Sequence, residues 1–338
     1  MACKFSNISK EFVLNPSSAL ANWVPLQPYK SATAVLFEWL YLGEKRFSEP
    51  FFDDSVLACR RAYPDQRRYK VVSDPDMLLQ WAEGLTSLPV TGIIFHVSRC
   101  GSTLLSQLLA ADEKNSVLSE VPFFDAMLRL PYQQAGVTTD QAEAYFKAAL
   151  AFYAQQRAAG QERLFIKADS WHLHFYTQLR RLFPAVPFFL LFREPMGVIR
   201  SQQRQRGLQS VPGMIEPQIL KLTKEQRVDF NLDRYMAAVL EEFYRQMTRM
   251  LQTDPLAFPL HYANGMENNI LQLYQHLHLP VDTQLASVFA DRCRFDAKRP
   301  QQAFAEEKNE EALPAYLKPA SDLYQQLTAV SATGSSAL

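Results

Sequence analysis

The sequence lacks the features that mark several protein classes. It has only four cysteines in 338 residues, with no CxxC pair, and its six histidines are scattered, so neither a disulfide framework nor a zinc site is indicated. Its most apolar run, AVPFFLLF, is too short to span a bilayer, and MACKFSNISKEF lacks the apolar stretch of a signal peptide. We expect a soluble, cytoplasmic protein that holds no metal.

The sequence also lacks a net charge. Its 35 Lys and Arg residues balance 35 Asp and Glu residues, so no global basic field is available to hold a nucleic acid or an anionic membrane. A polyanionic ligand therefore has to meet a local basic site. Hydrophobic residues make up 48% of the chain, which suffices for a large core in one big domain or two small ones.

Two regions differ in composition and pattern. Residues 1–86 are rich in aromatics and prolines, with a short helix predicted at 56–63, and are expected to form an N-terminal extension of unknown role. Over residues 87–330, apolar runs alternate with stretches of helical periodicity, which predicts an α/β domain. Residues 331–338 are small and polar, and we expect them to be a disordered tail.

The apolar runs predict buried parallel strands, because crossover helices cover both faces of a parallel sheet. The expected fold class is therefore α/β, with a central parallel sheet in a three-layer α/β/α arrangement. The predicted strands are 91–97, 163–168, 187–192 and 257–262, and the helices that follow them are 102–111, 171–183, 196–205 and 266–277. Two longer amphipathic helices, 142–157 and 232–251, are expected to pack outside them.

The first predicted strand leads into a glycine-bearing turn, SRCGST at 98–103, and directly into a helix. This arrangement directs free backbone N–H groups and the positive end of the helix at one spot, which favours a phosphate. A Walker A loop would need Gly and Lys where the chain has His96 and Ser102, so ATP chemistry with Mg²⁺ is disfavoured. The alternative is an ordinary strand-to-helix turn with a Ser or Thr cap.

A second basic stretch, LLFREPMGVIRSQQRQR, begins in the third predicted strand and continues into the helix that follows it. Arg193 ends that strand, and Ser201 lies eight residues further on, in the next helix. Because α/β folds bind ligands at the carboxyl ends of their strands, the two stretches together favour a ligand that carries phosphates at two ends. The alternative for the arginines is a solvated basic helix face.

Together, SRCGSTLL and FREPMGVIRS resemble the paired signature of sulfotransferases that use 3′-phosphoadenosine 5′-phosphosulfate (PAPS). These enzymes carry a 5′-phosphosulfate loop of the form R-S-G-[ST]-T-x-L or K-[ST]-G-T-T, and a 3′-phosphate element R-D-P-x-x-x-x-x-S. Arg99 instead of Lys is closer to the protein-tyrosine and trehalose sulfotransferase branches, whereas Cys100 and Glu194 depart from the usual Ser and Asp. The resemblance covers residues 89–327 and implies a P-loop NTPase-like fold.

The resemblance also implies a catalytic apparatus. Glu120 stands where the Arg-type branches carry the general base that takes the proton of the acceptor hydroxyl. Asp125 is the alternative base, and the structural alternative for Glu120 is a helix cap or first-turn acid. Lys167 would face the transferring sulfuryl group, or would instead form a strand-end salt bridge with Asp169.

The nucleotide-binding residues follow from the same resemblance. Arg99 is expected to stabilise the charge of the transferring group in an in-line displacement, by analogy with phosphoryl transfer but without a metal. The residues expected to hold the 5′-phosphate are Cys100, Gly101, Ser102 and Thr103, and those for the 3′-phosphate are Arg193 and Ser201. Lys298 or Arg299, in a polar loop, are candidates for a further contact with the nucleotide.

Two other functions stay open. An ATP-dependent kinase would need Mg²⁺ and would show no preference for a 3′-phosphate. A nucleotide-binding protein without catalysis would use its aromatic N-terminal region to bind a partner. In the leading hypothesis the partner is a hydroxyl-bearing acceptor, whose hydroxyl can belong to a sugar, a peptide tyrosine, a lipid or a natural product.

Overall fold

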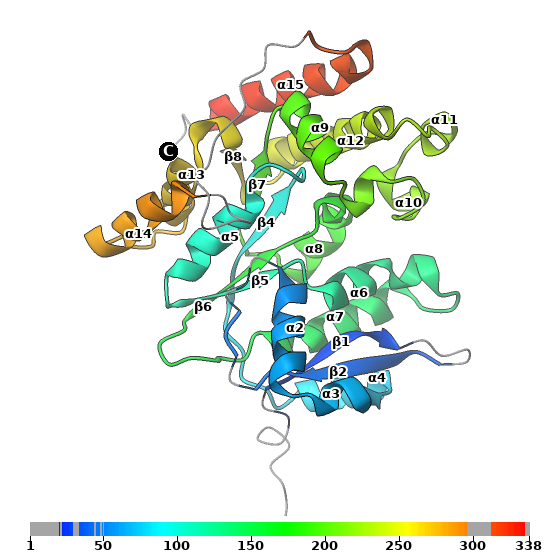
Figure 1. The fold of residues 1–338 in the computed structure, drawn as a ribbon, viewed down its shortest axis with the longest axis vertical. Coiled ribbons are helices and arrows are strands. Elements are labelled where there is room, and N and C mark those ends of the chain that lie inside the picture. Colours follow the sequence, from blue (N-terminus) through cyan, green and yellow to red (C-terminus); the bar gives the residue numbers. More distant parts are fainter. Residues whose placement is uncertain are drawn as a thin grey trace, which may run out of the picture.

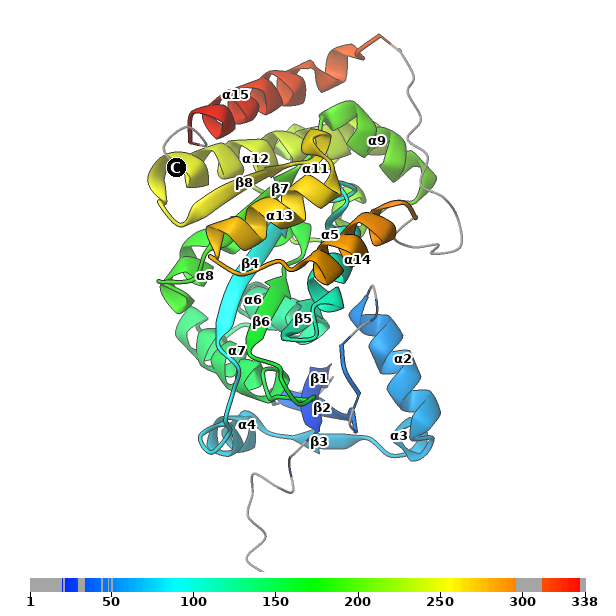
Figure 2. The ribbon, with the colours of Figure 1, turned by 90° about the vertical axis from the view of Figure 1, so that its left-hand side faces the viewer.

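A central parallel sheet with helices on both faces lies next to a smaller antiparallel sheet (Figures 1 and 2). The structure is a computed structural model that describes residues 20, 22–29, 34–43, 45–47, 49, 51–295 and 312–334. Within these residues the predicted three-layer α/β fold with a central parallel sheet is confirmed.

The central sheet has the strand order β5-β6-β4-β7-β8, with every neighbouring pair parallel. Its strands are β4 (Val90–His96), β5 (Asn115–Ser119), β6 (Arg163–Lys167), β7 (Phe188–Phe192) and β8 (Ala257–His261). The first strand of the sheet, β4, thus lies in its middle, and the winding of the chain reverses there. In open α/β sheets such a reversal opens a crevice at the carboxyl ends of the strands.

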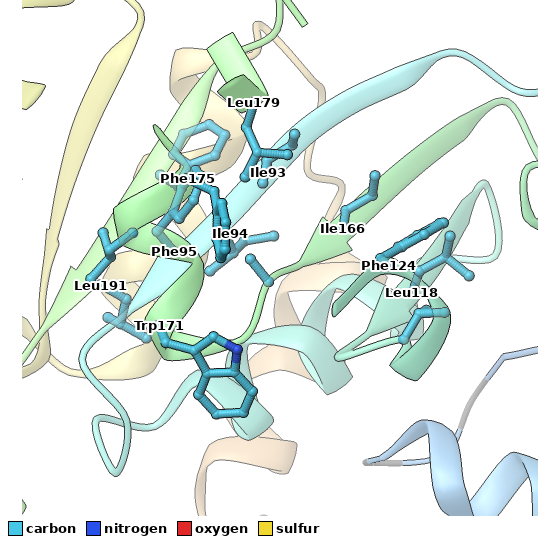
Figure 3. Packing of buried hydrophobic residues seen from close by; sticks show 14 of the residues in the cluster. Ile93, Ile94, Phe95, Leu118, Phe124, Ile166, Trp171, Phe175, Leu179 and Leu191 are labelled. Atoms are coloured by element: carbon cyan, nitrogen blue, oxygen red, sulfur yellow. The ribbon is translucent and has the colours of Figure 1, made fainter. Parts of the chain in front are cut away.

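The strands are buried because both faces of the sheet are covered. All five residues of β7, FFLLF, are buried, and Figure 3 shows side chains of β4, β5, β6 and β7 packed against those of the covering helices. The predicted strands agree with β4, β6, β7 and β8 to within one residue at each end.

The sequence analysis missed β5, because its sequence NSVLS carries polar residues at buried positions. The Asn115 side-chain amide Nδ2 donates hydrogen bonds there to the Leu109 carbonyl (2.8 Å) and the Tyr274 hydroxyl (2.9 Å). A polar edge strand of this kind does not show the apolar run that a buried strand usually has.

Helices cover the two faces of the sheet. On one face α5 (Ser102–Ala111) packs on β5, with α13 (Met266–His276) and α14 (Thr283–Cys293) against it. The opposite face carries α6 (Pro122–Gln133), α7 (Thr139–Tyr153), α8 (Tyr176–Leu182) and α12 (Leu232–Thr253), and α15 (Lys318–Gly334) lies along α12. Three further helices of the α/β domain are α9 (Pro195–Arg204), α10 (Pro217–Leu220) and α11 (Lys224–Arg227).

One predicted helix and the predicted start of the C-terminal tail need correction. The helix predicted at 171–183 is divided into a 3₁₀ turn, Ser170–Phe175, which Asp169 caps, and α8. The tail was predicted to begin at residue 331, but α15 continues to Gly334, and the Ser331 hydroxyl donates to the Leu327 carbonyl (2.7 Å). Residues 335–338 lie outside the described part.

The N-terminal region forms its own antiparallel sheet, β1 (Trp23–Tyr29), β2 (Leu36–Tyr41) and β3 (Val71–Ser73). Around it lie α2 (Phe52–Ala62), α3 (Asp65–Arg68) and α4 (Pro75–Ala82). This sheet packs on α6 and α7 of the α/β domain, where the ring of Phe37 lies 5.1 Å from Phe123 and 5.5 Å from Tyr145. The two regions therefore share one hydrophobic core.

Within the described residues, no helix is both long and apolar enough to cross a lipid bilayer.

Candidate active site

The carboxyl ends of the parallel strands open into one cleft of about 2070 Å³. Residues that follow each of the five strands line it: Glu120 after β5, Asp169 after β6, Arg99 after β4, Arg193 after β7 and Tyr262 after β8. The strand β6 itself ends in Lys167, which is 1% exposed and lies behind the wall of the cleft. Ser119, the last residue of β5, and Ile94 of β4 both pair with Lys167, and β4 continues two residues beyond this level to His96.

The loop between β4 and α5 has the backbone that an anion site needs. Ser98, Arg99 and Gly101 have φ angles of +68°, +51° and +85°, which fold the loop tightly before α5 begins at Ser102. A Cβ at Gly101 would lie 3.0 Å from the Met266 sulfur, so the position has no room for a side chain. The first amides of α5 have no acceptor within the helix and form its positive end.

Cys100 does not face the cleft. Its side chain is fully buried, and its thiol contacts the Leu191 carbonyl at 3.5 Å. Burial raises the pKa of the Cys100 thiol to about 12. Cys100 therefore packs the loop onto β7, while Gly101, Ser102 and Thr103 line the cleft.

The two predicted phosphate elements touch each other. Arg99 Nε donates to Ser201 Oγ at 2.7 Å, and Arg193 Nη1 donates to the Arg99 carbonyl at 3.3 Å. The guanidinium of Arg193 also lies 4.2 Å from the centre of the Tyr262 ring. The backbone carbonyl of Arg193 accepts a hydrogen bond from the Tyr244 hydroxyl (2.7 Å). The predicted residues of both sites thus form one cluster on the β4–β7 side of the cleft.

Glu120 lies at the other end of this row of strands. Its backbone has a φ of +52°, and its carboxylate oxygen Oε1 lies 2.8 Å from Lys167 Nζ and 3.2 Å from His96 Nε2. Burial acts to raise the pKa of Glu120, but the charge of Lys167 and the hydrogen bond from His96 outweigh it and hold that pKa well below its usual range. The shortest contacts with Lys167 and with His96 are both made by Oε1.

His96 links the anion loop to Glu120. Its Nδ1 accepts the Ser98 backbone N–H at 3.0 Å, so the proton of the neutral ring sits on Nε2, which faces Glu120. Burial lowers the pKa of His96, which keeps the ring neutral near pH 7. The sequence analysis assigned His96 no role, although its place at the carboxyl end of β4 was a usable signal.

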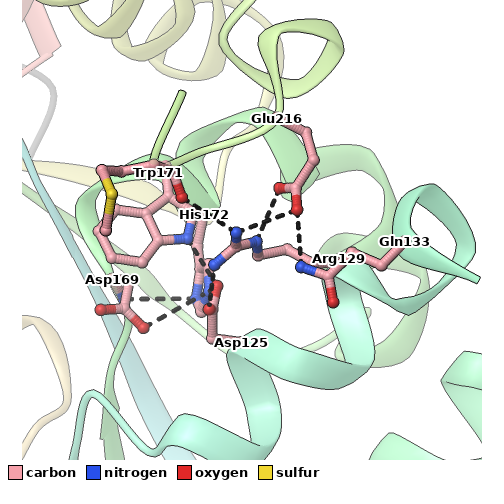
Figure 4. Close-up of polar contacts among 8 residues, drawn as sticks. Asp125, Arg129, Gln133, Asp169, Trp171, His172 and Glu216 are labelled. Atoms are coloured by element: carbon pink, nitrogen blue, oxygen red, sulfur yellow. Dashed lines mark hydrogen bonds and ion pairs between the residues drawn. The ribbon is translucent and has the colours of Figure 1, made fainter. Parts of the chain in front are cut away.

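Asp125, the alternative base, is surrounded by donors (Figure 4). Its Oδ1 accepts from Trp171 Nε1 (2.6 Å) and from His172 Nε2 (3.0 Å), and its Oδ2 pairs with Arg129 Nη1 (2.9 Å). Burial acts to raise the pKa of Asp125, but His172 and Arg129 lower it. Both oxygens are thus engaged, which leaves Asp125 less available to an acceptor hydroxyl than Glu120.

Asp125, Asp169 and His172 place their ligand atoms within 4.8 Å of one another. An ion there would have to displace the hydrogen bond from Trp171 and would lie beside the guanidinium of Arg129. The group therefore fits a hydrogen-bonded network better than an ion site. Burial, together with the charges of Glu120 and Asp125, raises the pKa of Asp169 well above its usual value.

The structure brings most of the predicted site residues into the cleft. Those that line it are Arg99, Gly101, Ser102, Thr103, Glu120, Arg193 and Ser201. The ion-pair partner of Lys167 is Glu120, whereas the sequence analysis considered Asp169. Lys298 and Arg299 lie outside the described residues.

Some lining residues were missed altogether. Tyr262 was expected at the core or the rim, and the residues from the N-terminal region were given no chemistry. Those N-terminal residues are Leu26, Gln27, Phe51, Asp53, Val56 and Arg60. No motif marks them, because they reach the cleft only through the packing of the small sheet and α2 against the α/β domain.

Comparison with known proteins gives structural matches only. No protein-family model matches the sequence, and no curated protein matches it. Solved structures that match it include sulfotransferases. One from Alicyclobacillus acidocaldarius has 14% identity and a TM-score of 0.38, covering 73% of this chain and 92% of its own. One from Mycobacterium avium has 14% identity and a TM-score of 0.42, covering 83% and 81%.

A mouse sulfotransferase complexed with PAP has 9% identity and a TM-score of 0.40, covering 78% of this chain and 94% of its own. The family that the two sequence motifs resemble is also the family of these structures, which do not distinguish its Arg-type branch. At such identities and TM-scores, the matches assign no role to any residue of this chain.

Proposed function

We propose that this protein is a sulfotransferase that moves the sulfuryl group of PAPS to an acceptor hydroxyl. One observation carries the proposal: the glycine-bearing loop that leads into α5, a second arginine and serine pair, and the Glu120 carboxylate all line one cleft at the carboxyl ends of one parallel sheet. PAPS carries negative charge at both ends, and its acceptor must lose a proton.

The residues fit the donor substrate in three parts. The N-terminus of α5, with Ser102 and Thr103, supplies amide and hydroxyl donors for the 5′-phosphate. Arg193 and Ser201 supply charge-assisted hydrogen bonds for the 3′-phosphate. The guanidinium of Arg193 makes a cation–π contact with the ring of Tyr262. Arg99 lies between them, where its guanidinium can stabilise negative charge on the transferring group.

Glu120 is the proposed general base. Its low pKa keeps it ionised at neutral pH, so it can accept a proton there, but it also makes Glu120 a weaker base than a carboxylate with an ordinary pKa. In the balanced step, a bond forms between the acceptor oxygen and sulfur, and the bond between sulfur and the 5′-phosphate oxygen breaks. Its electron pair leaves on adenosine 3′,5′-diphosphate (PAP), and the hydroxyl proton passes to Glu120.

Binding of PAP tests the proposal without an acceptor. Charge-assisted hydrogen bonds contribute roughly 1.5 to 3 kcal/mol each, so two of them to the 3′-phosphate make PAP bind ~10² to 10⁴ times more tightly than ADP or AMP. We expect calorimetry to show this gap without added metal. Arg193→Ala should erase most of it while leaving the weak AMP affinity nearly unchanged.

Equal affinities for PAP and ADP in the wild-type protein, or a strict need for Mg²⁺, would overturn the proposal in favour of an ATP-dependent kinase. Tight PAP binding without turnover of labelled PAPS on any hydroxyl compound would instead indicate a nucleotide-binding protein without catalysis.

A further inference from the structure

A buried histidine lies between the β4–α5 loop and the proposed base. His96 is the last residue of β4 and is only 4% exposed, and it lines the cleft. Its two ring nitrogens face two different elements. Nδ1 accepts the Ser98 N–H of the loop at 3.0 Å, and Nε2 lies 3.2 Å from Glu120 Oε1. The ring therefore bridges the loop and the carboxylate.

The protonation state of this ring follows from its partners. Because Nδ1 accepts the Ser98 N–H, the neutral ring carries its proton on Nε2. Burial lowers the pKa of His96 and outweighs the hydrogen bonds to Glu120 and to the Ala168 carbonyl, which act to raise it. The charge of Lys167 adds to the lowering. His96 is thus a neutral donor near pH 7, and since its one lone pair is used by Ser98, it cannot itself take the proton of the acceptor.

The contact with Ser98 holds a loop whose backbone is otherwise unfavourable. Ser98 and Arg99 have φ angles of +68° and +51°, a region that residues other than glycine adopt rarely and keep only where the surrounding structure holds them. On the other side of the loop, Gln202 Nε2 of α9 donates to Ser98 Oγ at 3.2 Å. Gln202 is fully buried, and its Oε1 accepts the Gly207 N–H at 2.8 Å. His96 and Gln202 therefore fix the conformation that presents Arg99.

The contact with Glu120 acts on the carboxylate. Glu120 also has a positive φ, +52°, and Lys167 Nζ lies 2.8 Å from its Oε1. An ammonium is a point charge on a flexible stem, so it attracts a carboxylate without fixing its orientation. The N–H of a buried ring has a fixed direction, and His96 supplies that direction at the same oxygen.

We propose that His96 is a positioning residue of the transfer, whose Nδ1 holds the donor-binding loop and whose Nε2–H orients the Glu120 carboxylate. The inference rests on the proposed function, since it concerns the same reaction. The proton of the acceptor hydroxyl passes to Glu120, and the proton of His96 stays on Nε2. Displacing a reacting group by about 1 Å can cost ~10²-fold in rate, so His96 affects the rate without touching either substrate.

Two substitutions separate the two nitrogens. His96→Asn keeps an acceptor for Ser98, because an Asn side chain accepts the backbone N–H two residues further on, but it has no atom at the place of Nε2. We expect an unchanged Kd of PAP and a single-turnover rate lower by ~10- to 10²-fold. His96→Gln reaches the place of Nε2 with an amide donor but offers Ser98 no acceptor. It should weaken PAP binding about 10-fold and keep most of the rate.

The rate is measured as the consumption of labelled PAPS by an excess of protein. Supplying 2-naphthol, N-acetyltyrosine amide and methyl glucoside together removes the need to choose an acceptor beforehand. The matched control is His174→Asn, because burial also keeps His174 neutral, lowering its pKa to about 3, but His174 does not line the cleft. This variant should leave the rate and the Kd of PAP unchanged.

A double variant distinguishes orientation of the base from a general effect on folding. If His96 acts through Glu120, His96→Asn should lower the rate no further when Glu120→Gln is already present. A further ~10-fold loss in the double variant would overturn the role at Glu120.

Nitrogen-15 NMR of the histidine rings in the PAP-bound protein tests the tautomer. We expect His96 to stay neutral, with its proton on Nε2, from about pH 6 to pH 8. A proton on Nδ1, an unchanged rate in His96→Asn or an unchanged Kd in His96→Gln would overturn this inference. A wild-type protein that binds PAP no better than ADP, or that binds PAP tightly and consumes no labelled PAPS, would instead overturn the proposed function.

Discussion

At the scale of single residues, the buried ammonium of Lys167 determines how Glu120 behaves. Lys167 is 1% exposed, and Glu120 is the carboxylate it pairs with. Removing one partner of a buried ion pair leaves an uncompensated charge, which costs more free energy of unfolding than the pair contributes when intact. A change at Glu120 therefore affects stability as well as proton transfer, and the two effects must be separated.

We expect Glu120→Gln to lower turnover by ~10² to 10⁴, because the base is lost, and to leave the Kd of PAP unchanged. It should also lower the free energy of unfolding by about 3 kcal/mol, because Lys167 loses its partner. The double variant Glu120→Gln with Lys167→Met should recover stability in urea titrations but not single-turnover activity. Recovery of both would mean that Glu120 is structural, and would move the base to Asp125 or a water.

At the scale of elements, the β4–α5 loop and α9 meet through Arg99 and Ser201. Their contact of 2.7 Å joins two side chains that the sequence analysis assigned to opposite ends of the nucleotide. Arg99 can turn to the transferring group when the donor binds, or it can stay with Ser201 as a ligand of the 3′-phosphate. The two roles predict different kinetics.

If Arg99 acts on the transferring group, Arg99→Ala should lower kcat by ~10² to 10³ and change the Kd of PAP little. Arg99→Lys should restore only part of this, since an ammonium lacks the planar fork of a guanidinium. Ser201→Ala should do the reverse, weakening PAP about 10-fold with a near-normal kcat. Equal losses of PAP affinity in both alanine variants, with normal kcat, would assign Arg99 to the 3′-phosphate.

At the scale of the whole molecule, the N-terminal sheet and the α/β domain share one hydrophobic core. Phe37 is fully buried between Phe123 and Tyr145, the ring of Trp39 lies 4.9 Å from that of Phe152, and the Tyr153 hydroxyl donates to a carbonyl of β1. The sequence analysis separated residues 1–86 as an extension. Several described residues of this region line the cleft, so the shape of the cleft depends on how the N-terminal sheet and α2 pack on the α/β domain.

We expect Phe37→Ala to lower the free energy of unfolding by about 3 to 4 kcal/mol, because it leaves a cavity in the shared core. Urea unfolding should remain a single transition that coincides by tryptophan fluorescence and by far-UV circular dichroism. Tyr69→Ala, at a residue 72% exposed, should change stability by less than about 0.5 kcal/mol. Two separate transitions in the wild-type protein would show that the regions fold independently.

The sequence by itself determined the parallel sheet and the position of the site along the chain. Four apolar runs marked β4, β6, β7 and β8, because strands covered on both faces need apolar residues throughout. The turn at 98–103 and the span from Arg193 to Ser201 stood out because anion binding needs glycine, hydroxyls and arginine at strand ends, and such local requirements are written in adjacent residues.

Only the tertiary structure decided which distant residues meet. The order β5-β6-β4 brings Glu120, Lys167 and His96 together. The strand β5 was not recognisable from local pattern, because its buried Asn115 donates to Tyr274, a residue far along the chain. The position of Phe51, which lines the cleft near Lys167, depends in the same way on the packing of α2 beside the sheet. Contacts of this kind follow from strand order and packing, which no local pattern encodes.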